Sequence, residues 1–443
     1  MVALTSTGKV LTWGQNSNGQ LGAGITATTP VPHPVYVKDE EGNDITGIKQ
    51  ISAGATHILA LTEDGEIWSW GQNNYGQLGI NNTSPSKKVS AIKVQKLNDD
   101  GTLSNQTGVK QVSAGDNFSV ILTEAGEAYA WGYNNYGQLG IGEVTAPKIP
   151  TRVDITDVKK VSAGGTFAVA LKTDGTVWTW GYNGYGQLSI GTLSTTASNA
   201  EYKRISPVQA LLGANTPLEG VKEVSAISST GYALLENGKV YAWGLNTSGQ
   251  IADNTVSNKK TGNCYATEMK TSGFGELQNI EKLVEGSNTN TNLMIDGEGN
   301  IYGNGVSSSM QLMSDRIGKT PFVLKLKEEY LELSNNQEYI EIGQTLNLSV
   351  NYKQGFNLKN KEKTIGDVKY SSSNENIATV NAQGIVTAKQ IGQVTIIAEN
   401  NGDIAQSIIN IVSKGAVAVP SVQSGTNFTV MLKEGRNSLD SWK

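Results

Sequence analysis

Histidine and cysteine carry most metal and nucleophile chemistry in proteins, and this chain has almost none of either. Its 443 residues include two histidines, His33 and His57, and one cysteine, Cys264. A structural zinc site needs about four Cys or His ligands, and a disulfide needs two cysteines. Neither histidine lies in a recognisable nucleophile motif. We therefore expect no enzymatic activity, no bound metal and no cofactor.

Short motifs that could bind nucleotides or calcium are incomplete. The glycine pairs at 273–275 and 303–305 do not continue as GxGxxG. The acidic clusters at 39–44 and 98–101 lack the spaced ligands and terminal glutamate of a calcium loop. We interpret the glycines as turn residues and the acidic clusters as solvated hairpin tips.

Composition excludes further classes of protein. Lys and Arg number 35 against 40 Asp and Glu, a net charge of −5 without a basic block, so we expect no nucleic-acid partner. No apolar run approaches the ~20 residues of a membrane span, and no secretory signal follows Met1. With 51 glycines, 10 prolines, 16 tyrosines and 8 tryptophans, the chain is typical of short strands joined by tight turns.

One sequence unit repeats along most of the chain. Residues 70–79 are WGQNNYGQLG, 131–140 are WGYNNYGQLG and 180–189 are WGYNGYGQLS. Weaker copies begin at Trp13 and Trp243, and a decayed copy occupies 304–313. The glycine that follows the Trp position occurs at 14, 71, 132, 181, 244 and 305, at intervals of 49 to 63 residues. A turn glycine always lies six residues before it. Constant spacing inside the unit and variable spacing outside it indicate a rigid repeat with tolerant loops.

Each copy predicts an antiparallel meander of four short strands. In the third copy these are 110–115, 118–123, 127–132 and 151–155, rich in β-branched and aromatic residues and bounded by Gly, Asn and Asp. A single such sheet would expose an apolar face. Sheets arranged radially bury these faces against their neighbours, and this arrangement is a β-propeller.

The repeats resemble the regulator of chromosome condensation repeat family, through the pattern VSAG…LT.DG.V..WG.N..GQLG over most of residues 1–326. The resemblance implies a β-propeller, seven-bladed in the best-known member, which is a nucleotide-exchange factor for the nuclear small GTPase. Bacterial relatives include a secreted inhibitor of β-lactamases. This chain has six signatures, and Asn304 occupies the Trp position of the sixth. We predict an all-β fold with about six four-stranded blades, or seven in a longer protein.

The two ends of the chain complement each other. Residues 1–14 begin inside a repeat and lack its opening strand, whereas 421–435 resemble that opening part. We predict that 414–435 close the N-terminal blade, followed by a tail at 436–443. The alternative is that both ends are cuts from a longer repeat array.

Residues 327–413 carry no copy of the repeat. Alternating apolar residues with turn glycines predict a small β-sandwich inserted in the ring. The stretch is similar to bacterial immunoglobulin-like group-two domains at 371–374, 377–380 and 384–388, with Tyr370 where Trp is frequent. Such domains are typical of bacterial surface and secreted proteins, so we expect an extracellular or cell-surface location.

The meander places two kinds of loop at one end of every blade: the loop after Ser-Ala-Gly and the WGxNxYGQLG loop. This end is rich in Asn and Tyr, and the opposite end is acidic. Rigidly held tyrosines suit partner recognition. The alternative is that these residues cap loops and pack between blades. The candidate contact residues are Thr56, His57, Asp116, Asn117, Gly165 and Thr166, with Tyr75, Tyr133, Tyr136, Tyr182 and Tyr185.

These observations favour a monomeric, non-enzymatic module of a secreted or surface protein that binds a protein or a carbohydrate. Two alternatives follow from the family resemblance alone: a regulator of a small GTPase that acts as an exchange factor, and a secreted inhibitor of the β-lactamase-inhibitor type. Fold does not transfer function across such a family.

Overall fold

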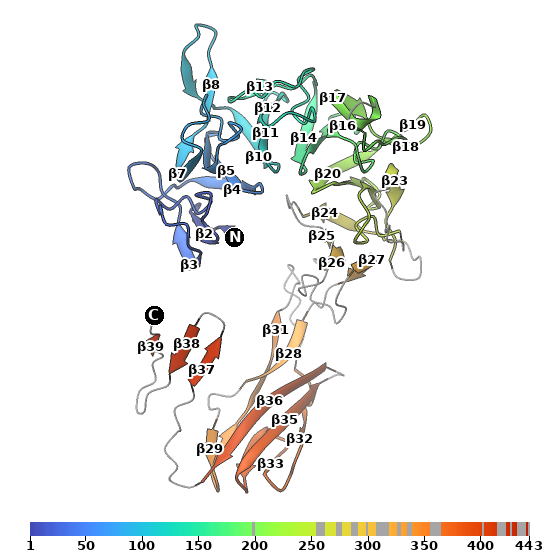
Figure 1. Cartoon of the computed structure of the whole chain (residues 1–443). Helices are drawn as coiled ribbons and strands as arrows, with labels where there is room; N and C mark the ends of the chain where they lie inside the picture. The colour runs from blue at the N-terminus through green and yellow to red at the C-terminus, as the bar shows by residue number, and fades with distance from the viewer. Residues whose placement is uncertain are drawn as a thin grey trace. The chain divides into compact units, whose positions relative to one another are not determined.

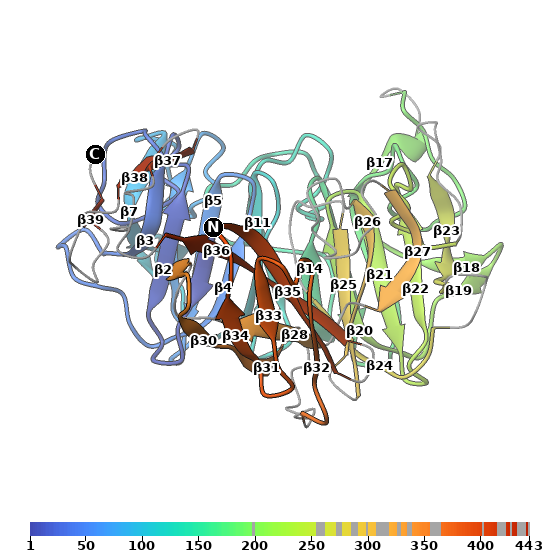
Figure 2. The same ribbon diagram turned by 90° about the horizontal axis from the view of Figure 1, so that it is seen from below.

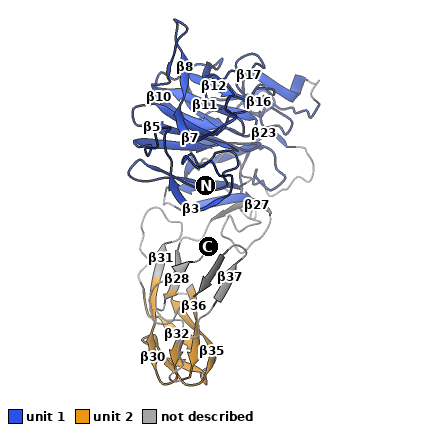
Figure 3. Ribbon diagram, turned by 60° about the vertical axis from the view of Figure 1, so that its left-hand side comes forward, with its two compact units in different colours: residues 1–326 blue, residues 327–443 orange. Residues whose placement is uncertain are grey.

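The chain folds almost entirely into β-strands, as its computed structural model shows (Figure 1). The predicted all-β class is confirmed. The chain divides into two compact units, Met1–Leu326 and Lys327–Lys443 (Figure 3). The structure describes residues 1–196, 200–253, 262–271, 277–284, 291–297, 300–306, 319–325, 329–334, 339–354, 365–400, 403–413, 422–425, 428–431 and 440–441.

Six antiparallel sheets follow one another round an arc in unit 1, one for each copy of the repeat (Figure 1). The first sheet has three strands, and the other five have four. The six-bladed propeller is thus confirmed. The sheets are β1 (Val2–Leu4), β2 (Val10–Gly14) and β3 (Val31–Tyr36); β4 (Ile48–Ala53), β5 (His57–Thr62), β6 (Ile67–Gln72) and β7 (Lys87–Lys93); β10 (Val109–Ala114), β11 (Phe118–Thr123), β12 (Ala128–Gly132) and β13 (Thr151–Arg152); β14 (Val158–Ala163), β15 (Phe167–Lys172), β16 (Val177–Tyr182) and β17 (Lys203–Gln209); β20 (Val221–Ile227), β21 (Thr230–Leu235), β22 (Val240–Gly244) and β23 (Asn263–Glu268); and β24 (Ile280–Leu283), β25 (Thr291–Asp296), β26 (Ile301–Val306) and β27 (Lys319–Lys325).

Two small hairpins, a 3-10 turn and the cysteine lie at or beyond the sheet edges. The hairpins are β8 (Gln95–Leu97) with β9 (Leu103–Asn105), and β18 (Leu211–Gly213) with β19 (Thr216–Pro217). The 3-10 turn is Ala200–Tyr202. Cys264 lies in β23, where it is half-buried and free.

In the second to fifth sheets, the repeat's tryptophan joins its sheet to the preceding one. Trp131 and Trp180 are fully buried, and their indole N–H groups donate to the backbone oxygens of Gln77 and Gln138, each at 2.9 Å. The same bond joins Trp243 to Gln187. Apolar side chains of consecutive sheets form shared clusters around these rings. Neighbouring sheets therefore bury the faces that a single sheet would expose.

The tight turn of each sheet also contacts the next sheet. Gly65, with φ of +78°, accepts a hydrogen bond from Val109 N–H at 3.1 Å, and Gly126 accepts one from Val158 N–H at the same distance. A positive φ favours glycine at these turns. The constant spacing of turn glycines in the sequence thus reflects a contact between sheets.

The sixth sheet keeps the inter-sheet bond although it has lost its tryptophan. The buried Asn304 amide donates to the backbone oxygens of Gly249 and Gln250 at 2.9 and 2.8 Å. Gln250 is the counterpart of Gln77 in the fifth repeat. A primary amide therefore replaces the indole as donor. The rest of this signature, from 307 onward, lies outside the described residues.

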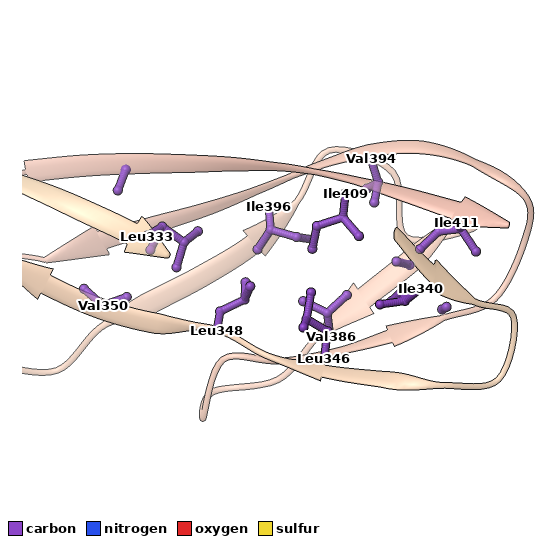
Figure 4. Close-up of a cluster of buried hydrophobic side chains, with 14 residues drawn as sticks. Leu333, Ile340, Leu346, Leu348, Val350, Val386, Val394, Ile396, Ile409 and Ile411 are labelled. Atoms are coloured by element: carbon purple, nitrogen blue, oxygen red, sulfur yellow. The ribbon is translucent and has the colours of Figure 1, made fainter. Parts of the chain in front are cut away.

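Unit 2 contains a β-sandwich, as predicted for residues 327–413. Strands β28 (Glu329–Ser334) and β31 (Ser349–Gln354) pair with each other. Leu346 and Val386 from one sheet meet Ile396 and Ile409 from another in a buried cluster (Figure 4). The two larger sheets are β29 (Tyr339–Glu341), β36 (Asp403–Val412), β35 (Gly392–Asn400) and β32 (Lys369–Ser372); and β30 (Thr345–Asn347), β34 (Ile385–Ala388) and β33 (Ala378–Val380).

The C-terminal segment forms a sheet of its own from β37 (Val422–Gly425), β38 (Phe428–Met431) and β39 (Asp440–Ser441). Gly425 stands opposite Phe428. Gly115 and Phe118 make the equivalent pair in the third sheet, where Gly115 N–H bonds to Phe118 O at 2.9 Å. The segment therefore has the hairpin register of the repeat, and closure of the N-terminal blade stays a prediction.

Candidate interaction surface

The two predicted kinds of loop meet at one end of the sheets. The strands of the sheets run alongside one another, so equivalent loops gather at the same end (Figure 2). Tyr133 N–H donates to Asn117 O at 2.9 Å, which joins the WGxNxYGQLG loop of the third sheet to the loop after Ser-Ala-Gly. Tyr182 N–H donates to Thr166 O at 3.0 Å in the fourth sheet.

The asparagine and glutamine of the WGxNxYGQLG loop are framework residues. In the third sheet, the fully buried Asn134 donates to Glu143 O at 2.9 Å and accepts from Leu139 N–H at 3.0 Å. Gln138 accepts from Tyr136 N–H at 3.0 Å. The second and fourth sheets repeat these bonds. The asparagines therefore hold the loop, which was the alternative to a role in partner recognition.

The tyrosines of the same loops form one continuous row of ring contacts across three sheets. Ring centroids are 4.7 Å apart for Tyr75 and Tyr133, 6.0 Å for Tyr133 and Tyr136, and 5.0 Å for Tyr136 and Tyr182. Tyr182 continues to Tyr185 at 5.8 Å. Tyr75 is 42% exposed, and the others are half-buried. All five predicted tyrosines thus come together at the surface.

A sixth tyrosine, Tyr202, completes this tyrosine row. Its ring centroid lies 5.9 Å from that of Tyr136 and 5.1 Å from that of Tyr182. Burial and the neighbouring phenols raise the pKa of Tyr202 to about 12. Tyr202 could not be predicted from the repeat pattern, because the 3-10 turn that carries it, Ala200–Tyr202, lies in a link of variable length between β16 and β17.

Two predicted contact residues are buried and cannot touch a partner, which corrects the candidate set. His57 is 0% exposed, and its Nε2 lies 3.0 Å from Ser119 Oγ. Burial disfavours the charged imidazolium and lowers the pKa of His57 to about 4. Gly165 is also buried, and its N–H donates to Ser228 O at 2.7 Å, which links neighbouring loops. Both residues hold the framework together.

The other predicted loop residues, Thr56, Asp116, Asn117 and Thr166, are half-buried. Asp116 is distinctive among them. Its N–H bonds to Gly165 O at 3.1 Å, yet its Oδ1 is buried without a hydrogen-bond partner among the described residues. Burial raises the pKa of this carboxyl. Asp116 therefore has a buried, unpaired acceptor oxygen next to the loops that carry the tyrosine row.

The described residues provide neither a metal site nor a membrane-crossing helix. No three side chains of His, Cys, Asp or Glu among them gather closely enough to hold an ion. Over the same part of the chain, no helix has the length and apolar character needed to span a bilayer.

The six radial sheets and their loop surface define a repeat β-propeller, a class that presents loops from a rigid framework. Residues 1–288 match the RCC1-like domain family, and the chain belongs to this family. Residues 330–403 match the bacterial Ig-like domain (group 2). Both resemblances drawn from the sequence are confirmed. The chain thus contains an RCC1-like propeller, a protein-interaction module.

Several known proteins are similar to part of the chain. The ultraviolet-B receptor UVR8 of Arabidopsis thaliana is 36% identical over 159 residues, which are 35% of this chain and 32% of that protein. The X-linked retinitis pigmentosa GTPase regulator of Canis lupus familiaris is 34% identical over 152 residues, 34% of this chain and 14% of that protein. The chain therefore covers about a third or less of these relatives. The crystal structure of human WBSCR16 matches with a TM-score of 0.56 at 22% identity, over 72% of this chain and 77% of that one, which shows the fold alone.

Proposed function

We propose that the chain is a non-enzymatic binding module that contacts a protein or a glycan through the tyrosine row. The observation that carries the proposal is that the repeat builds the same loop with or without tyrosine. Ser248 N–H donates to Gln250 Oε1 at 2.7 Å in the fifth sheet, as Tyr136 N–H does to Gln138 in the third. The loop does not need the aromatic side chains, so their presence on one part of the surface suits recognition.

The chemistry of the row supports such a role. Tyrosine provides a large contact area at low conformational cost and a hydroxyl for polar contacts. The rings also contact one another, which limits the rotamer freedom that a partner would have to freeze. The row runs over the second, third and fourth sheets only, so we expect the partner to contact these sheets and not the fifth and sixth.

The bacterial Ig-like domain supports a second part of the proposal, that the protein works outside the cell or at a bacterial cell surface. Cell fractionation with an antiserum against unit 2 tests this location. Recovery in the soluble cytosol alone would contradict it.

Regulation of a small GTPase is a second candidate, supported by the name of the canine relative, a GTPase regulator. The test is release of labelled guanine nucleotide from small GTPases with and without the chain. Catalysed release would favour this candidate over simple binding.

The binding proposal is tested with the double variant Tyr136→Ala, Tyr185→Ala. Wild type and variant are compared on a glycan array and in capture from bacterial and host surface extracts. Two buried aromatic anchors of ~1–3 kcal/mol each predict at least a tenfold loss of affinity for the captured ligand. The matched control is Tyr36→Ala, Tyr265→Ala, which removes two tyrosines outside the row. Equal binding by all three proteins at equal melting temperature would exclude the row as the site.

A further inference from the structure

The innermost strands of the propeller share a β-bulge near their first residue. The pairing register shifts between Val109 and Gln111 in β10, and the same shift recurs in β4, β14, β20 and β24. A bulge sets two residues against one on the neighbouring strand, so consecutive side chains no longer alternate strictly between faces. The extra residue is a lysine in four of these strands: Lys49, Lys110, Lys159 and Lys222.

Both residues of several bulges line one cavity of about 760 Å³, which all five inner strands surround. Its charged side chains are five lysines, Lys110, Lys159, Lys160, Lys222 and Lys282, and two glutamates, Glu223 and Glu281. The cavity therefore has a formal excess of three positive charges, whereas the whole chain has a net charge of −5. A concave site of one sign concentrates its electric field on ions of the opposite sign.

In β4, β10, β14 and β20, the residue after the bulge helps to build the cavity wall. The Gln50 side chain accepts from Val112 N–H at 3.1 Å and donates to Val112 O at 3.2 Å. Gln111 makes the same pair of bonds to Val161. Glu223 accepts from Leu283 N–H at 2.9 Å and pairs with Lys160 at 2.8 Å. These side chains bridge neighbouring inner strands, so their role is structural.

The lysines at the bulges are not used in this way. Within the part of the chain that the structure describes, Lys110, Lys159 and Lys222 form no ion pair, and the same holds for Lys282. Gathered ammonium groups repel one another, and neither the wall nor the sheets need these charges. An arrangement that concentrates unneutralised lysines in a cavity suits an anion.

We propose that this inner cavity binds a small, multiply charged phosphate compound. Lysine ammonium groups are compact point charges with three donors each, which suits phosphate oxygens. The cavity volume lies in the range of small-ligand sites. Ile51, Val284 and Ile295 add apolar surface beside the lysines, which suits a phosphate ester with an apolar group. The bulge lysines lie at the starts of the inner strands, and the tyrosine row lies beyond their ends, so the two sites are separate.

The experiment is calorimetric titration of the full chain with sodium tripolyphosphate at low and at physiological salt. The test variant is Lys110→Gln, Lys159→Gln, Lys222→Gln. The control is Lys96→Gln, Lys148→Gln, Lys369→Gln, which removes the same charge outside the cavity. We expect wild type and control to bind with equal, salt-sensitive affinity, and the cavity variant to bind at least about tenfold more weakly.

Melting temperatures distinguish loss of the site from loss of the fold. Without ligand, the cavity variant should be as stable as wild type or more stable, because charge repulsion is removed, and tripolyphosphate should raise the melting temperature of wild type only. If the triple variant unfolds, Lys159→Gln alone should show a smaller loss of affinity. No binding by wild type, an equal loss in the control, or tighter binding of hexaglutamate than of tripolyphosphate would overturn the proposal. The Tyr136→Ala, Tyr185→Ala variant should bind tripolyphosphate normally, so each site can fail independently.

Discussion

Sheets two to four and sheets five and six descend from the same repeat pattern but have kept different parts of it. Both groups keep the donor that joins a sheet to the preceding loop: Trp180 bonds to Gln138, and Asn304 bonds to Gln250. Only the first group keeps the tyrosines. Where Tyr136 stands in the third sheet, Ser248 stands in the fifth. The inter-sheet bond is therefore a requirement of the fold, and the tyrosines are not.

Gly71 is the framework position at which we expect a substitution to cost the most stability. Its φ is +101°, and an added Cβ would lie 2.8 Å from His57 Cα. Gly71→Val should therefore destabilise unit 1 by about 3 kcal/mol or more, measured by urea unfolding. Gly101→Val is the control, because Gly101 also has a positive φ of +80° but no atom within 4 Å of the added Cβ. Equal losses in both variants would attribute the effect to φ alone.

His57 should make the second sheet sensitive to acid, unlike the third and fourth, which carry Phe118 and Phe167 at the same position. Its pKa is lowered to about 4 in the folded chain, from an ordinary value of 6.5. The unfolded chain therefore binds the proton first as pH falls. Stability is fully present above pH 6.5 and is lost progressively toward pH 4, by up to about 3 kcal/mol.

The measurement is the pH dependence of unfolding for wild type and His57→Phe. The variant should lose less stability than wild type between pH 6.5 and pH 4. Identical slopes in this window would contradict a buried neutral imidazole.

Asn304→Ala tests whether the sixth sheet depends on the amide that replaces the indole. The variant removes two buried hydrogen bonds, to the backbone oxygens of Gly249 and Gln250, which keep only the Ala252 N–H and the Tyr232 hydroxyl as donors. We expect a loss of about 2–3 kcal/mol in chemical unfolding. Asn292→Ala is a neighbouring control that removes a buried amide bonded to Asn304 but not to the fifth sheet. An effect of Asn304→Ala below that of the control would refute the bridging role.

The smallest expected effect belongs to the tyrosine row. Tyr136→Ser imitates the fifth repeat, in which Ser248 makes the same backbone bond, so it should change stability by less than about 1 kcal/mol. Thermal melting measures this. A loss as large as that of Asn304→Ala would show that the tyrosines hold the fold, and the binding proposal would lose its support.

Much of the architecture could be predicted from the chain itself. The interval between glycines such as Gly71 and Gly132 predicted the number of sheets, because a tight turn, a strand and a loop of fixed length leave little freedom within a repeat. The same periodicity identifies the Trp of WG as a repeated framework position. It did not decide whether the WGxN asparagines hold the loop or bind a partner, and the hydrogen bonds of Asn134 settle this for the framework.

Tertiary structure decided what periodicity cannot express. Tyr202 belongs to the tyrosine row although it lies in a link of irregular length. His57 is not part of the candidate surface, because its side chain is buried. Alternation along a strand would place Lys110 and Gln111 on opposite faces, but the bulge turns both toward one cavity. Sequence fixes the local geometry of each repeat through backbone sterics and turn residues. Which side chains from different repeats meet depends on the radial packing of the sheets, and only the folded chain contains that information.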